Sequence, residues 1–170
     1  MGRRSEIELV EEGRVEMNFR ILPIPPEISD QVRRTMISPQ YQSLAAAASV
    51  ANGYGPCRSC LKVFNQGVDQ RIFFTYNSFD GLSSLPDPGP VFIHAEVCEP
   101  CGGELPDDIL ELPVYFEAYG EDSHLIERER MDKSDVNQQL KRLLSIHGVK
   151  FVNLRNAEAG CYIAKAIPVE

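Results

Sequence analysis

Two Cys-x-x-Cys pairs constrain this chain more than any other feature of its sequence. The first spans Cys57–Cys60 and the second spans Cys98–Cys101. A tight turn between two cysteines three positions apart aims both sulfurs at one point, and two such pairs complete a closed tetrahedral zinc site. The apolar runs between the pairs are strand-sized, so the fold can return the second pair to the first. The sequence therefore predicts a structural zinc site whose ligands are Cys57, Cys60, Cys98 and Cys101.

Other roles for these residues stay open. His94 is an alternative ligand, but four residues of extended strand would place it roughly 13 Å from Cys98 at about 3.3 Å per residue. Joint ligation by these two residues therefore requires a bend at Glu96 or Val97. The paired cysteines can instead be reduced thiols that pack as small apolar side chains, or a redox dithiol, although neither pair lies in a thioredoxin-like pattern. The fifth cysteine, Cys161, is expected to be a buried small hydrophobic residue.

The composition argues against several classes of protein. The net charge is −8 over 170 residues, and the basic clusters at Arg33-Arg34 and Lys141-Arg142 are short, so phosphate neutralisation by a basic surface is not expected. No apolar run approaches the roughly 20 residues of a membrane helix. Acidic residues follow the two early arginines where an export signal would be apolar. We therefore expect a cytoplasmic protein with no nucleic-acid or membrane partner.

Most of the chain is a series of strand patterns separated by turns that contain glycine or proline. Alternating, aromatic and β-branched residues predict the strands. These cover residues 17–22, 61–64, 71–76, 91–95, 114–119, 124–129, 151–155 and 161–167. Short loops join the fifth strand to the sixth and the seventh to the eighth, so both pairs are expected to be antiparallel. Residues 78–90, with several glycines and prolines, are expected to form a surface loop.

Helical patterns are few. One helix is predicted to begin at Pro26 and end before Pro39, and residues 106–110 predict a single turn. The clearest helix has an apolar stripe and stops at Gly148. The stripe consists of Val136, Leu140, Leu143 and Leu144. Residues 44–50 are helix formers by propensity alone.

The order of these patterns predicts the architecture. Because the helices are few and do not alternate regularly with the strands, the expected class is α+β. We expect a mainly antiparallel sheet with the C-terminal amphipathic helix packed on one face. Residues 17–170 are expected to form a single domain, preceded by a poorly ordered segment over residues 1–16.

No residue can be named as catalytic from the sequence. It contains no Gly-rich phosphate loop, nucleophile elbow or metalloprotease helix motif. A small enzyme is nevertheless an alternative to a purely structural zinc protein, with a pocket around His94, Arg58, Tyr76 and Arg155. A second alternative is an acidic protein-binding module, which fits the net charge. The residues alone leave the biochemical role unknown.

Four segments carry a resemblance to a known family. They are Gly55–Leu61, Phe74–Phe79, Gly89–Glu99 and Arg155–Tyr162. With them the chain resembles the domain of unknown function 1203 family over about residues 17–168. Members of that family do not regularly have a cysteine at the position of Cys101, so the resemblance implies that a four-cysteine site would be particular to this chain and its near relatives. It implies no activity for any residue.

Overall fold

The computed structural model of this chain describes residues 18–42, 44–53, 55–79 and 89–170. The segment expected to be poorly ordered, residues 1–16, lies outside the described residues, as does most of the predicted loop over 78–90. Within the described ranges the chain forms eight strands in antiparallel sheets and three helices. This confirms the expected mixture of helices with mainly antiparallel strands. No helix in these ranges has both the length and the apolar character needed to cross a membrane.

The larger sheet has five strands and contains both ends of the described chain. Its order is β1 (Asn18–Leu22), β8 (Tyr162–Val169), β7 (Phe151–Asn156), β5 (Val114–Tyr119) and β6 (Leu125–Arg130). Every neighbouring pair is antiparallel. The predicted pairing of the last two strands across the Gly160 loop is therefore confirmed, and so is the predicted hairpin of β5 and β6.

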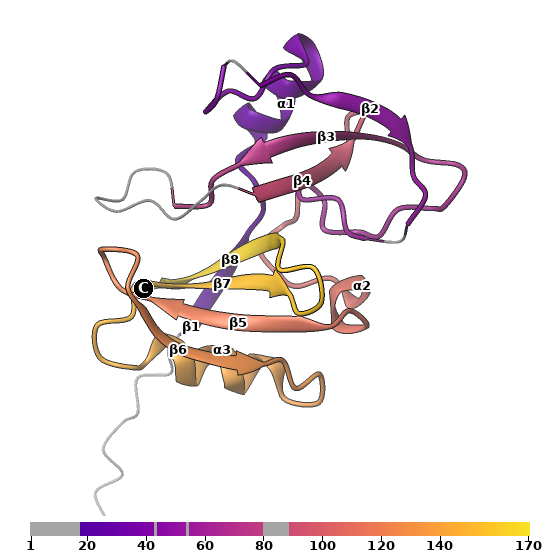
Figure 1. Ribbon diagram of the computed structural model, residues 1–170. Coiled ribbons are helices and arrows are strands. Elements are labelled where there is room, and N and C mark those ends of the chain that lie inside the picture. The colour runs from indigo at the N-terminus through magenta and orange to yellow at the C-terminus, as the bar shows by residue number, and fades with distance from the viewer. Residues whose placement is uncertain (1–17, 43, 54, 80–88) are drawn as a thin grey trace, which may run out of the picture.

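The smaller sheet has three strands and lies beside the larger one (Figure 1). Its order is β2 (Ala47–Val50), β3 (Gln70–Tyr76) and β4 (Gly89–His94). The first helix, α1 (Pro26–Thr35), lies next to this sheet, whereas α3 (Val136–Leu144) lies along the larger sheet. The short helix α2 (Asp107–Leu110) comes between β4 and β5 in the chain.

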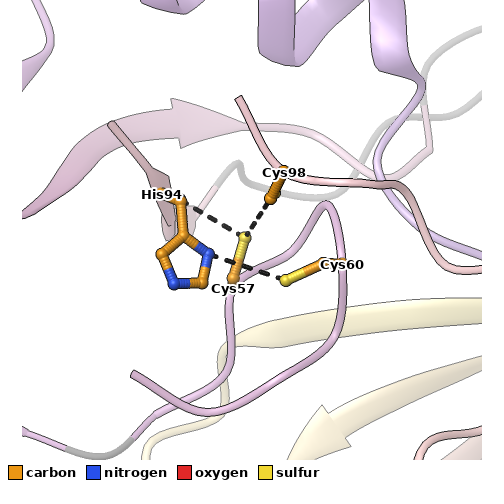
Figure 2. A group of neighbouring side chains, drawn as sticks. All are labelled: Cys57, Cys60, His94 and Cys98. Carbon is orange, nitrogen blue, oxygen red and sulfur yellow. Dashed lines mark hydrogen bonds between the residues drawn. The ribbon is translucent and has the colours of Figure 1, made fainter. Parts of the chain in front are cut away.

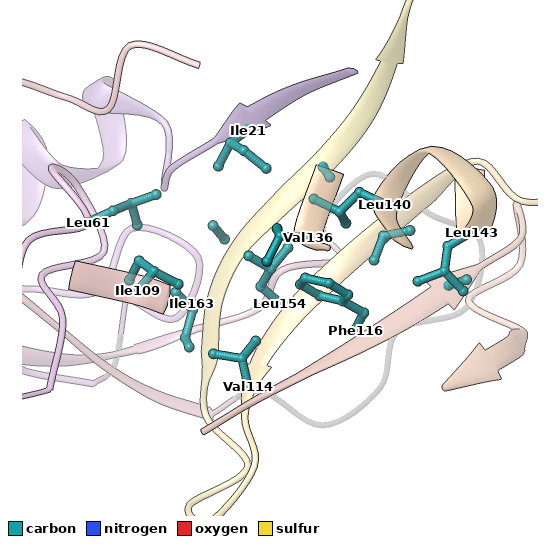
Figure 3. Close-up of a cluster of buried hydrophobic side chains, with 14 of the residues drawn as sticks. Ile21, Leu61, Ile109, Val114, Phe116, Val136, Leu140, Leu143, Leu154 and Ile163 are labelled. Carbon is teal, nitrogen blue, oxygen red and sulfur yellow. The ribbon is translucent and has the colours of Figure 1, made fainter. Parts of the chain in front are cut away.

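The apolar stripe of α3 is buried in the core of the larger sheet (Figure 3). Leu140 and Leu143 are fully buried, and Val136 and Leu144 are nearly so. These side chains share one cluster with apolar residues of β5, β7 and β8. Burial of this stripe is the main contribution that holds α3 in place, because a helix of nine residues is marginal by itself.

A second core lies under the smaller sheet. Alternate residues of β3 and β4, among them Ile72, Phe74 and Ile93, pack against Val32 of α1. Tyr162 of β8 belongs to this second core as well, and its ring lies 5.5 Å from that of Tyr76 of β3. The two sheets therefore meet at this pair of tyrosines.

Two local predictions were wrong. Residues 44–50 do not form a helix, since Ala47–Val50 is the edge strand β2, paired antiparallel with β3. Pairing with a buried neighbour overrides the helical propensity of this alanine-rich segment. Residues 61–64 make only a single bridge, between Pro56 and Val63, and no strand.

The burial of the α3 stripe predicts the cost of truncating it. Leu140→Ala should lower the free energy of unfolding by about 2–5 kcal/mol, as deletions in packed cores do. Gln138 lies exposed on the same helix, so Gln138→Ala should change stability by less than about 0.5 kcal/mol. Urea denaturation of both variants checks this, and equal midpoints would show that the stripe is not buried.

Candidate metal centre

Three cysteines and one histidine converge at the end of β4 (Figure 2). They are Cys57, Cys60, His94 and Cys98. One ligand atom from each residue lies within 4.8 Å of every other, and this group can hold a metal ion. Cys57 and Cys60 are buried, and Cys98 and His94 are partly exposed. All five cysteines of the chain are free thiols.

Two of the separations between these atoms match edges of a tetrahedral site. An ion bound at about 2.3 Å from sulfur and about 2.0–2.1 Å from nitrogen requires sulfur–sulfur edges of about 3.8 Å and sulfur–nitrogen edges of about 3.6 Å. The Cys57 and Cys98 sulfurs lie 3.8 Å apart. The Cys60 sulfur lies 3.6 Å from Nδ1 of His94. These two separations are those that one tetrahedral ion requires, and the other pairs of ligand atoms lie within 4.8 Å.

A tight turn places the first two sulfurs. The amide of Leu61 donates to the carbonyl of Cys57 at 2.8 Å, and the amide of Ser59 donates to the Cys57 sulfur at 3.4 Å. Leu61 closes the turn with φ of 61°, in the left-handed region that favours glycine. Its side chain is fully buried in the core of the larger sheet. Burial of this leucine therefore offsets the strain of a turn that the sequence does not build with glycine.

The end of β4 places the other two ligands. The strand stops at His94, and the chain bends at residues 95 and 96 before it reaches Cys98. This bend is the condition under which His94 and Cys98 can bind one ion together. The amide of His94 also donates to the Cys57 sulfur at 3.3 Å, so the strand end and the turn are joined directly.

A carboxylate orients the histidine ring. Nε2 of His94 lies 3.3 Å from a carboxylate oxygen of Asp69, and that oxygen accepts the amide of Asn65 at 2.8 Å. With Nε2 donating to Asp69, Nδ1 presents its lone pair toward the sulfurs. The ring also packs on Phe64, with centroids 4.6 Å apart. No sequence pattern marked Asp69, because it precedes β3 and belongs to neither Cys-x-x-Cys pair.

A guanidinium from α1 completes the surroundings. Nη2 of Arg33 donates to the Cys98 sulfur at 3.5 Å, and its Nε donates to the carbonyl of His94 at 3.0 Å. The Arg33 side chain is only 8% exposed, and it also pairs with Asp30. From the sequence we interpreted Arg33-Arg34 as part of a short basic cluster, and nothing in the pattern linked it to the cysteines.

The three thiols of the cluster differ in the direction in which their pKa values are shifted. Hydrogen bonds from Cys60 and Cys98 hold the pKa of Cys57 well below its usual range, despite burial. Their contact with Cys57 in turn raises the pKa values of Cys60 and Cys98. The Cys57 sulfur also raises the pKa of His94, and Asp69 adds to this effect. The cluster therefore favours one thiolate, at Cys57, beside groups that keep their protons, and a cation can take the place of those protons.

Cys101 lies outside this cluster, so the group in the structure differs in one member from the set expected from the sequence. Its amide donates to the carbonyl of Ser59 at 3.0 Å, and its sulfur donates to the carbonyl of Glu104 at 3.0 Å. Cys101 packs against the core of the larger sheet, whereas Cys57, Cys60 and Cys98 belong to the core of the smaller one. His94, which the sequence offered as an alternative ligand, is the fourth member of the cluster.

The pocket residues expected from the sequence are also separated. Arg58 is 4% exposed and donates to the carbonyl of Tyr162 at 2.7 Å. Tyr76 and Arg155 line a cavity of about 220 Å³, but His94 and Arg58 are not among its lining residues. Cys161, which we expected to be buried, is partly exposed and lines the same cavity.

The fold and the cluster define a mixed α and β protein with a candidate metal centre. The chain belongs to the family described as protein of unknown function (DUF1203), which matches residues 54–167 and confirms the resemblance of its motifs. All four residues of the cluster lie within that range, and α1 with Arg33 precedes it. No curated protein and no solved structure matches the chain.

The left-handed turn at Leu61 generates a stability prediction. Leu61→Ala should cost about 2–5 kcal/mol of unfolding free energy through lost packing. Leu61→Gly removes one more carbon but relieves a backbone penalty of roughly 1–2 kcal/mol. We therefore expect Leu61→Gly to be at least as stable as Leu61→Ala in urea. If the glycine variant were clearly the less stable of the two, the turn would not have this conformation.

Proposed function

We propose that this protein is a zinc-stabilised domain, in which Cys57, Cys60, His94 and Cys98 hold one structural zinc ion. The observation that carries the proposal is the convergence of the four ligand atoms within 4.8 Å of one another. Thiolates and imidazole are the ligands that zinc prefers in closed sites. The carboxylate contact to the histidine ring is also typical of zinc sites.

The donor set supports a structural role for zinc. Catalytic zinc sites usually have three protein ligands and leave a fourth position to water or substrate, whereas structural sites fill all four positions with side chains. Three sulfurs and one nitrogen make four ligands here. On this proposal the ion contributes folding free energy and binds no substrate.

Bound zinc would connect segments that are far apart in the chain. The turn at Cys57–Cys60, the end of β4 and the segment at Cys98 all supply ligands, and Arg33 links α1 to the same point. The core of the smaller sheet is modest in size, and an ion at its edge would stabilise it as metals do in small domains.

The proposal predicts the metal content of the protein and of three variants. Protein purified without chelator and in reducing buffer should contain about one zinc per chain by elemental analysis. Cys98→Ser and His94→Ala each remove a proposed ligand and should lose most of that zinc or unfold. Cys101→Ser should keep it, because the Cys101 sulfur bonds to the carbonyl of Glu104.

Cys101→Ser and His94→Ala thus form a matched pair. The four-cysteine set predicted from the sequence gives the opposite outcome, with zinc lost from Cys101→Ser and retained by His94→Ala. Either that reversal or a wild-type protein that is folded, reduced and free of metal would contradict the proposal.

Arg33 provides an electrostatic prediction. Zinc with three thiolates and a neutral imidazole has a net charge of −1, which a buried guanidinium beside Cys98 offsets. Arg33→Gln should therefore weaken zinc affinity by about 10-fold or more. The measurement is competition with a chromophoric chelator.

Arg34→Gln is the matched control, since it removes the same charge from the same helix. Arg34 is exposed and bonds to the carbonyl of Asp30, so its substitution should leave zinc affinity nearly unchanged. Equal losses in the two variants would show that only net charge matters and that the contact of Arg33 with Cys98 contributes nothing to zinc affinity.

A further inference from the structure

A second site lies where the two sheets meet, apart from the metal centre. The cavity of about 220 Å³ is bounded on one side by the end of β3 and the start of β4, and on the other by β7, the loop after it and the start of β8. Its lining residues are Tyr76, Asn77, Ser78, Gly89, Pro90, Arg155, Ala159, Gly160, Cys161 and Tyr162. The described residues that line the cavity include one guanidinium and no carboxylate.

Tyr162 contributes a tyrosine hydroxyl to the wall of this cavity. Its side chain lines the cavity although the residue is only 6% exposed. Its ring lies beside that of Tyr76, another residue of the cavity wall. A tyrosine hydroxyl in a cavity wall can donate a hydrogen bond to a bound ligand or to ordered water.

Arg155 supplies a positive charge with donors to spare. Its Nε donates to Glu117 at 2.7 Å, and its Nη1 donates to the carbonyl of Gly160 at 3.0 Å. These contacts use two of the five N–H groups that a guanidinium carries. They also hold the guanidinium in place at the cavity wall, as a binding site requires.

The charges around the cavity favour an anion. Glu117 is the carboxylate that pairs with Arg155, but it is shared with Arg128 at 3.4 Å. Lys165 donates to the carbonyl of Ser78 at 2.9 Å, and Arg58 donates to that of Tyr162. The described residues here thus carry more positive than negative charge, in a chain whose net charge is −8.

Burial strengthens the role of Tyr162 as a donor. Burial of the ring raises the pKa of Tyr162 well above its ordinary value, so the hydroxyl keeps its proton at neutral pH. A neutral hydroxyl next to a guanidinium donates to an anionic oxygen without adding negative charge of its own.

We propose that this inter-sheet cavity binds a small oxyanion, the carboxylate or phosphate group of a small molecule, through Arg155 and Tyr162. The volume limits the ligand, because 220 Å³ holds about seven waters at about 30 Å³ each. That is below the range of about 300–1,000 Å³ typical of sites for drug-sized ligands. The site is independent of zinc, so either proposal can fail without the other.

The reactivity of the Cys161 thiol can report whether the cavity is occupied. It lines the cavity, whereas Cys101 is another partly exposed thiol that lies elsewhere. We would alkylate the full-length protein with iodoacetamide and follow both cysteines by mass spectrometry, while titrating inorganic phosphate in one arm and malonate in another. Potassium chloride at matched ionic strength is the control. The alkylation rate at Cys161 should fall about 3-fold or more in a saturable manner, and the rate at Cys101 should not change.

The variants test the two donors. Tyr162→Phe removes only the hydroxyl and should weaken the apparent affinity about 10-fold, the value of one hydrogen bond to a charged group. Arg155→Gln should abolish protection, and Tyr115→Phe, which alters a tyrosine outside the cavity lining, should leave it intact. If Arg155→Gln does not fold, Tyr162→Phe still decides the matter.

Each outcome has a stated meaning. Protection by phosphate alone or by malonate alone identifies which oxyanion the site prefers, and protection by both supports the shared chemistry. Protection equal to that of chloride, or a Tyr162→Phe variant with unchanged affinity, would overturn the proposal.

Discussion

The convergence of three thiols and one imidazole on a single point is the constraint on which the smaller half of this structure depends. The Cys57 and Cys98 sulfurs lie 3.8 Å apart, and the Cys60 sulfur lies 3.6 Å from Nδ1 of His94. All four ligand atoms lie within 4.8 Å of one another, around one position that an ion can occupy. The backbone conforms to this arrangement. β4 ends at His94, the chain bends before Cys98, and Leu61 adopts a left-handed conformation to close the turn.

The arrangement also explains how the two cores are linked. Cys57 and Cys60 belong to the core of the smaller sheet, and the next residue, Leu61, is buried in the core of the larger one. The turn therefore fixes the two halves to each other through adjacent residues. All four residues of the edge strand β2 are exposed, so this strand adds little buried surface. A bound ion would compensate for that shortage.

The sequence predicted the elements that have strong periodicity and short connections. The α3 stripe and the β7–β8 pairing needed only local information. The helical pattern of residues 44–50 was misleading, because Ala47–Val50 pairs with β3. Such a tertiary contact is not described by helix propensity.

The candidate site was predictable only where spacing carries the information. Three of its cysteines were identified from the Cys-x-x-Cys pairs, and His94 was recognised as conditional on a bend that spacing cannot reveal. Cys101 has the spacing of a ligand, yet its amide and sulfur bond to backbone carbonyls. Asp69 and Arg33 reach the site from distant segments, and no pattern in the chain connected them to it.

X-ray absorption at the zinc edge counts the ligands on the metal in the intact protein. Zinc held by Cys57, Cys60, His94 and Cys98 should show three sulfur ligands at about 2.3 Å and one nitrogen ligand at about 2.0–2.1 Å. The nitrogen signal should disappear in His94→Ala, if zinc is retained at all, and persist in Cys101→Ser. A wild-type spectrum with four sulfur ligands, or a reduced and folded protein with no bound zinc, would show that these four residues do not form a zinc site.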